Sequence, residues 1–104
     1  HGILASAKAA LEALRKYLSV ELGPGGITVN AVNPGYTMTP MQEAEYSPEM
    51  LTKVNGIIPM KRHARPEDIA ALYVYLASDE AGYASGAVFT LDGAESVASG
   101  AAYL

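Results

Sequence analysis

The order of helical and strand patterns along this chain restricts its fold more than any other feature. Apolar residues at three- and four-residue spacing predict an amphipathic helix over residues 4–22, which Gly23-Pro24-Gly25-Gly26 ends. A β-branched, apolar run then predicts a buried parallel strand over 27–32. A second helix opened by Pro66 and a second buried strand over 87–91 repeat this order. Such an alternation builds a parallel sheet through right-handed crossovers.

Two strands cannot complete such a sheet. They would leave backbone groups unpaired along the edges and an apolar face open to water. We therefore expect further strands from an upstream segment or from a separate chain. The first residue is His1 rather than Met, and a helical pattern starts within a few residues of it. Both observations lead us to expect that these 104 residues are part of a longer domain.

Charge and composition argue against several classes of protein. The net charge is −4, with 7 basic residues scattered along the chain, so no basic field for nucleic acid is expected. The chain has no Cys and 2 His, which leaves no disulfide framework and no convincing zinc set. Its apolar stretches are interrupted well short of the roughly 18 residues that a membrane span requires. We expect a soluble, cytoplasmic protein without nucleic-acid or membrane partners.

A long excursion separates the first strand from the second helix. It covers residues 36–65, and Ser47-Pro48-Glu49 predicts a short helix within it, with Met50, Leu51 and Val54 on the inner side. Excursions at the carboxyl end of a strand are often lids or substrate loops. Methionines here could line such a loop with deformable apolar surface, or fill the core beneath it. The four methionines of this region are Met38, Met41, Met50 and Met60.

Sequence signals mark the start and the end of the second predicted helix. Arg65-Pro66-Glu67-Asp68 places proline and two acids in its first turn, and we expect it to end near Ser78. Asp92-Gly93 closes the second strand, and residues 94–104 carry only a weak pattern. The apolar face of this helix is predicted to consist of Ile69, Leu72, Tyr73 and Leu76.

A polar loop follows the first strand. The strand pattern breaks at Pro34-Gly35, and polar residues continue to Met41. Open α/β sheets bind their ligands at the carboxyl ends of strands, so this loop is a candidate cofactor site. A dinucleotide also needs a glycine-rich turn for its pyrophosphate, and the chain contains none. The loop therefore predicts one half of a cofactor site.

Five motifs in register resemble the short-chain dehydrogenase/reductase family, over nearly the whole chain. They are Ala5–Leu11, Val20–Val32, Asn33–Met41, Arg65–Ala70 with Leu76–Asp79, and Gly86–Gly93. The resemblance implies an α/β fold, the C-terminal part of a Rossmann-type doubly wound parallel sheet in three α/β/α layers. Residues 1–104 would be the C-terminal portion of a single domain, and the N-terminal cofactor-binding half of the same protein would be a partner absent from this sequence.

The family resemblance also implies ligands and assembly. The cofactor would be NAD or NADP, and the substrate a small molecule or an acyl thioester. Members commonly form dimers or tetramers, so the resemblance points to Leu11–Leu22 and Tyr73–Phe89 as interface regions. The apolar residues there are equally explained by packing against a missing sheet.

Lys8 matches the family's active-site lysine, which binds the nicotinamide ribose and lowers the pKa of a catalytic tyrosine. A cation beside a phenol favours the phenolate, so the role is chemically sound. The alternative is an exposed helical lysine paired with Glu12 one turn later.

The loop after the first strand matches the family's nicotinamide site. Pro34 and Gly35 match a turn that packs on the nicotinamide, where a missing side chain permits close approach. The backbone of Tyr36 and the hydroxyl of Thr39 match groups that bind the carboxamide. The alternative is an ordinary turn that ends a strand. The substrate loop would include Met38, Met41 and Met50.

The chain departs from the family at the proton donor. The usual tyrosine lies four positions before the lysine, where this chain has Leu4, and an apolar side chain exchanges no proton. A subgroup resembling the enoyl-[acyl-carrier-protein] reductases places it seven positions before, which is His1 here. His1 could act as an acid, because an unperturbed imidazole titrates near neutrality, or it could be a frayed terminal residue. His63 is expected to be a solvated loop residue.

Three functions remain open from the sequence. The first is an NAD(P)(H)-dependent oxidoreductase, a reductase of a carbonyl or enoyl group, seen as its C-terminal fragment, which alone would be inactive. The second is a catalytically silent or split family member with a binding or assembly role, which Leu4 favours. The third is an independently folded domain of unrelated function, which the unpaired sheet disfavours.

Overall fold

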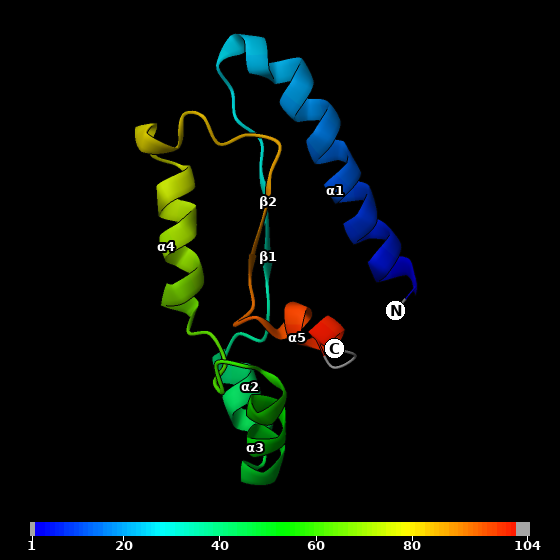
Figure 1. Ribbon diagram of the computed structural model, residues 1–104, viewed down its shortest axis with the longest axis vertical. Coiled ribbons are helices and arrows are strands. Elements are labelled where there is room, and N and C mark those ends of the chain that lie inside the picture. Colours follow the sequence, from blue (N-terminus) through cyan, green and yellow to red (C-terminus); the bar gives the residue numbers. More distant parts are fainter. Residues whose placement is uncertain (1, 102–104) are drawn as a thin grey trace. The chain divides into compact units, whose positions relative to one another are not determined.

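The computed structural model describes residues 2–101, and Figure 1 shows its elements along the chain. The chain divides into two compact units. The first unit comprises His1–Val32 and Val74–Phe89, and the second comprises Asn33–Tyr73 and Thr90–Leu104. The elements are α1 (Gly2–Leu22), a 3-10 helix η1 (Gly23–Gly25), β1 (Ala31–Pro34), α2 (Pro40–Glu45), α3 (Pro48–Ile57), α4 (Pro66–Leu76), a second 3-10 helix η2 (Asp79–Ala81), β2 (Val88–Leu91) and α5 (Glu95–Ala101).

The two strands form a parallel pair, as the alternation predicted. They make a two-stranded sheet, in which Ala31 N donates to Ala87 O at 2.9 Å and Gly35 N donates to Leu91 O at 2.8 Å. The offset between the bonded residues is the same at both ends, which is the pattern of parallel strands. The carboxyl ends of β1 and β2 therefore meet at one edge of the sheet.

The first strand starts later than its sequence pattern predicted. Residues 27–30 belong to no ladder, and β1 begins at Ala31. The side chain of Asn30 takes the place of a backbone pair there, because its Nδ2 donates to Ala84 O at 2.8 Å and its Oδ1 accepts from Ala87 N at 3.2 Å. Val29 N likewise donates to the hydroxyl of Ser85. Together with the backbone bond from Gly86 N to Val29 O, these side-chain hydrogen bonds replace the regular ladder at residues 29 and 30.

In the first unit, α1 is held to the turn before β2. The Arg15 guanidinium donates to Gly86 O, and Gly86 has a φ of 75°. A Cβ at Gly86 would lie 3.2 Å from the hydroxyl oxygen of Ser19 on α1. This turn needs glycine both for its backbone angle and for the close approach of the helix.

The second unit contains helices that the sequence pattern did not predict. Thr39 caps α2 by accepting from Gln42 N, while the Gln42 side chain accepts from Thr39 N. This reciprocal capping box was visible in the sequence as Thr39-Pro40-Met41-Gln42, although the helix it opens is only six residues long. The carboxylate of Asp92 stabilises the start of α5, because it accepts from Ala94 N and Ser96 N.

The other predicted helices agree with the structure at their starts. Ser47 caps α3 by accepting from Met50 N at 3.1 Å, and α4 opens at Pro66. The prediction that Met50 points inward is wrong, since this side chain is 49% exposed. Tyr73, predicted on the apolar face of the second helix, is 56% exposed. The caps fix where a helix begins, but the side chains that cover its apolar face come from the rest of the fold.

Few described side chains are buried. Ile58 and Ala81 are each 2% exposed and His63 is 6% exposed, whereas β1 and β2 contain no buried residue. The prediction of buried strands is thus wrong for this chain, since each strand pairs with only one neighbour among the described residues. Ile58, at the end of α3, lies against Gly93, where a Cβ would be 2.9 Å from Ile58 Cγ2 and the φ is 62°. None of the described helices is long and apolar enough to cross a membrane.

Candidate functional site

The loop after β1 is fixed by hydrogen bonds to a single residue of the second unit. Ala64 N donates to Tyr36 O at 2.8 Å, and Met38 N donates to Ala64 O at 2.9 Å. Thr37 and Ala64 accordingly form a parallel bridge. The bridge holds the loop extended from Gly35 to Met38 before α2 begins.

The bridge leaves the backbone of Thr37 on the opposite edge of the loop. In a parallel bridge the N–H and C=O of the central residue point away from its partner. Neither group of Thr37 is hydrogen-bonded to another described residue, although its hydroxyl donates to Gly35 O at 3.1 Å. One donor and one acceptor are therefore left side by side for a ligand.

A cavity of about 620 Å³ adjoins this loop. The residues predicted for the nicotinamide loop come together here, and Met41 of the predicted substrate loop joins them. The Thr39 oxygen is used in capping α2, which leaves its hydroxyl proton to donate elsewhere. The cavity is lined by Pro34, Gly35, Tyr36, Thr37, Thr39, Met41, Gln42 and Glu95.

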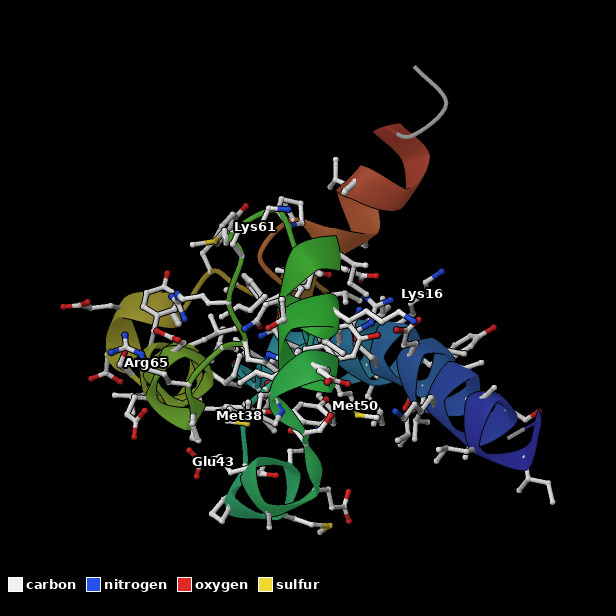
Figure 2. The ribbon with its side chains drawn as sticks, turned by 90° about the horizontal axis from the view of Figure 1, so that it is seen from below. Lys16, Met38, Glu43, Met50, Lys61 and Arg65 are labelled. Atoms are coloured by element: carbon white, nitrogen blue, oxygen red, sulfur yellow. The ribbon has the colours of Figure 1, made fainter. Side chains whose placement is uncertain are left out.

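Other predicted site residues lie elsewhere. Met38 is partly buried beside the bridge and Met50 is exposed on α3; both are labelled in Figure 2. Neither of them lines this cavity. Lys8 is exposed on α1, in the first unit, and no ion pair joins it to Glu12 among the described residues. His1 lies outside the described residues.

Gly35 is required by a protein contact. A Cβ at this position would lie 2.6 Å from Asp92 Cβ and 2.7 Å from Asp92 Cα. The absence of a side chain at Gly35 thus makes room for Asp92 at the end of β2. Asp92 in turn stabilises the start of α5, so one residue links the two loops at this sheet edge.

His63 is buried, and the prediction of a solvated loop residue is wrong. Its Nδ1 donates to Asn55 Oδ1 at 2.7 Å, and its Nε2 is hydrogen-bonded to the Tyr46 hydroxyl at 3.4 Å. Its ring also makes edge contacts with Tyr36 and Tyr46, at centroid distances of 5.7 and 5.4 Å. The partners come from three separate stretches of sequence, so no local pattern could reveal the burial.

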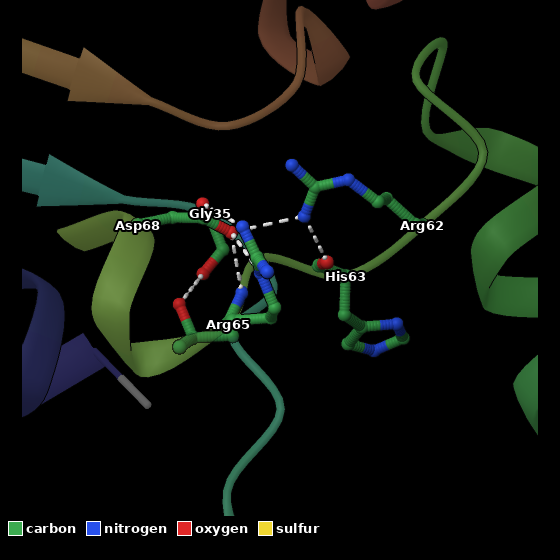
Figure 3. A network of polar contacts seen from close by, with 6 residues as sticks. Gly35, Arg62, His63, Arg65 and Asp68 are labelled. Carbon is green, nitrogen blue, oxygen red and sulfur yellow. Dashed lines mark hydrogen bonds and ion pairs between the residues drawn. The ribbon is translucent and has the colours of Figure 1, made fainter.

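Two arginines share one carboxylate at the start of α4. Asp68 accepts from Arg62 at 2.9 Å and from Arg65 at 3.0 Å, as Figure 3 shows. The Arg62 guanidinium also donates to His63 O. Hydrogen bonds from Arg65, then from Arg62, hold the pKa of the Asp68 carboxyl well below its usual range. This cluster borders a second cavity, of about 260 Å³, whose other lining residues are mostly apolar.

We predict that acid destabilises the second unit through Asp68 and Asp92. Hydrogen bonds from Ser96 lower the pKa of Asp92, as those from Arg65 lower that of Asp68. Because both folded-state pKa values lie below those of the unfolded chain, the stabilisation is complete above about pH 5 and is lost as the pH falls below about 4. Thermal melts of the full-length protein from pH 7 to pH 3 measure this.

The Asp68→Asn variant identifies the source of that loss. It should melt below the wild type at pH 7, and the difference should shrink as the pH falls below about 4. Asp79→Asn, in the 3-10 helix η2, is the matched control because its carboxylate has no partner among the described residues. A constant difference between Asp68→Asn and wild type at every pH would contradict the assignment.

The sequence is similar to a family model and to several known enzymes. The sequence matches the family model described as enoyl-(acyl carrier protein) reductase over residues 1–94. It is 43% identical over 93 residues to a 3-alpha-(or 20-beta)-hydroxysteroid dehydrogenase of Mycobacterium tuberculosis, covering 89% of this chain and 33% of that protein. It is 41% identical over 88 residues to an acetoacetyl-CoA reductase of Cupriavidus necator, covering 85% and 35%.

A solved structure is similar over the same part of the chain. An Agrobacterium tumefaciens protein crystallised with bound NADP superimposes with a TM-score of 0.79 at 35% identity, covering 88% of this chain and 38% of that protein. The chain thus spans about a third of the length of the relatives it matches.

Proposed function

Because this chain belongs to the short-chain dehydrogenase/reductase family, we propose that it is the C-terminal portion of an NAD(P)(H)-dependent oxidoreductase. The proposed substrate is a carbonyl or enoyl compound, including acyl thioesters. The single observation that carries the proposal is the Thr37 backbone: its N–H and C=O are not hydrogen-bonded to another described residue, and Thr37 is one of the residues that line the cavity. We further propose that the remaining two-thirds of the domain, upstream, supplies the adenosine end of the cofactor site.

The residues of the cavity fit a nicotinamide. Its carboxamide offers one acceptor and a pair of donors, which matches a residue that presents both an N–H and a C=O. The Tyr36 carbonyl already accepts from Ala64, so we propose the Thr37 backbone in place of the Tyr36 backbone as the carboxamide contact. The Thr39 hydroxyl supplies a further donor. When bound, the nicotinamide would supply or accept the hydride.

Lys8 has the chemistry for the ribose side of the site. Its ammonium group is exposed on α1 and donates three hydrogen bonds, so it can bind ribose hydroxyls and favour a nearby phenolate or other anion. We propose this role from the family motif around it. His1 remains a candidate for the proton donor of the seven-residue register.

A binding role without turnover is the second candidate. Leu4 occupies the position of the usual proton donor, and the structure places it on α1, one turn before Lys8, with 56% of its surface exposed. A protein that holds NAD(P)H without a proton donor would bind the cofactor and leave it unreacted. Measuring cofactor binding and turnover on the same protein distinguishes this candidate from the first.

The decisive experiment uses the full-length protein. NADH and NADPH binding is measured by fluorescence, and turnover by the fall in absorbance with acetoacetyl-CoA or crotonyl-CoA as probes. Binding with turnover supports the oxidoreductase, and binding with a flat trace supports the silent member. If neither cofactor binds, the proposed function is wrong.

We predict that Thr39→Ala weakens NADH binding about fivefold, since one hydrogen bond to the carboxamide is lost. The substitution also removes the cap of α2, so a matched control is needed. Ser47→Ala removes the equivalent cap of α3 and leaves the cavity untouched. Fluorescence titration should show weaker binding for Thr39→Ala alone. Equal affinities in the two variants would exclude a direct contact.

A further inference from the structure

His63 is the most enclosed polar side chain among the described residues, and the proposed reaction assigns it no role. Its three side-chain partners come from different parts of the second unit. Tyr36 belongs to the loop after β1, residues 34–39, which is proposed to bind the nicotinamide and is called the nicotinamide loop below. Tyr46 ends α2, and Asn55 lies on α3. The imidazole is therefore where the α2–α3 segment, residues 40–57, meets the loop that precedes it.

The contacts fix the imidazole in one orientation. Asn55 Oδ1 is only an acceptor, so Nδ1 carries a proton and donates to it at 2.7 Å, and Nε2 is hydrogen-bonded to the Tyr46 hydroxyl at 3.4 Å. The Tyr36 and Tyr46 rings meet the imidazole edge-on, at interplanar angles of 65° and 61°. A ring held through both nitrogens and by two aromatic neighbours cannot rotate without losing several contacts at once.

We propose that His63 is a positioning residue that holds the α2–α3 segment against the nicotinamide loop and thereby sets the affinity for substrate. The proposal rests on the proposed function and on Met41 of this segment, which lines the cavity and which the sequence predicted to belong to a substrate loop. The imidazole itself is not placed in contact with substrate or cofactor. Its effect passes through Tyr46 and Asn55 to the two helices.

The contacts of the His63 side chain differ from those that hold the nicotinamide loop. The nicotinamide loop is held by the backbone bonds of Tyr36 and Met38 to Ala64, and these do not involve the His63 side chain. Loss of the imidazole contacts should therefore loosen the α2–α3 segment while the loop keeps its hydrogen bonds. Substrate affinity should fall, and cofactor affinity should remain.

The test compares Tyr46→Phe and His63→Phe in the full-length protein. Each keeps an aromatic ring and removes hydrogen bonds, so we expect KM for acetoacetyl-CoA to rise about fivefold with kcat and the Kd of NADPH unchanged. Amide hydrogen exchange over residues 40–57 should quicken about fivefold in the same variants. Tyr83→Phe is the matched control, since its ring is fully exposed and outside the second unit.

The two measurements separate the possible failures. Unchanged hydrogen exchange in Tyr46→Phe overturns the proposal, even if His63→Phe does not fold. Faster exchange with an unchanged KM overturns the substrate role. If the wild-type protein binds neither NADH nor NADPH, the proposed function fails, and hydrogen exchange alone decides whether His63 holds the segment.

Discussion

Replacing Lys8 with alanine in the full-length protein is expected to lower kcat/KM by about 100-fold or more and to weaken NADH binding about tenfold. The lysine would lose its hydrogen bonds to the ribose hydroxyls and its electrostatic effect on the group that exchanges the proton. A charged hydrogen-bond donor contributes more than a neutral one, so the effect on binding should exceed that of Thr39→Ala. Steady-state kinetics with acetoacetyl-CoA and fluorescence titration with NADH measure the two effects.

Lys16→Ala is the control for Lys8→Ala. Lys16 lies on the same helix and is also exposed, so its replacement removes the same charge from α1 (Figure 2). It should leave both constants unchanged. Equal effects in the two variants would show that only the charge of the helix matters, and unchanged constants in Lys8→Ala would refute the assignment of Lys8. If the wild type binds NADH without turnover and Lys8→Ala weakens that binding, the result supports the catalytically silent family member.

Gly35→Ala is expected to lower the free energy of unfolding by about 3 kcal/mol, the upper end of the usual cost of overpacking. The added Cβ would meet Asp92 Cα at 2.7 Å, and a backbone atom cannot move aside as the end of a flexible side chain can. The melting temperature of the full-length protein should fall by roughly 6–10 °C. A thermal melt followed by circular dichroism measures it.

Gly56→Ala is the matched control for Gly35→Ala. Gly56 lies within α3, and a Cβ there would have no heavy atom within 4 Å. Alanine is favoured over glycine in a helix, so this variant should be stabilised by about 0.5–1 kcal/mol. If Gly35→Ala melts with the wild type and only its NADH affinity falls, the glycine serves the nicotinamide rather than the sheet edge.

The helices and strands that have a strong local sequence pattern were predictable. The spacing of Leu11, Leu14 and Leu18 predicted α1, Pro66 marked the start of α4, and the apolar run before Asp92 predicted β2. Each signal is contained within one element. Helices α2 and α5 are short and depend on single caps, Thr39 and Asp92, so hydrophobic spacing alone could not reveal them.

The candidate site was predictable only where its residues are consecutive. Pro34, Gly35, Tyr36 and Thr39 lie within six consecutive residues, so a motif identified them, and all four line the cavity. The availability of the Thr37 backbone depends on the bridge to Ala64, which lies far along the chain. His63 was missed for the same reason, because its burial comes from residues 36, 46 and 55 rather than from its own neighbours.

The close approach of Gly35 and Asp92 is expected to couple substitutions at two positions that are distant in the sequence. A larger residue after β1 could be accommodated only if the backbone after β2 moved away, and that backbone also opens α5 through Asp92. Substitutions at either position are therefore expected to be rare and to occur together. The start of α5 is thus expected to restrict how far the loop after β1 can change among relatives.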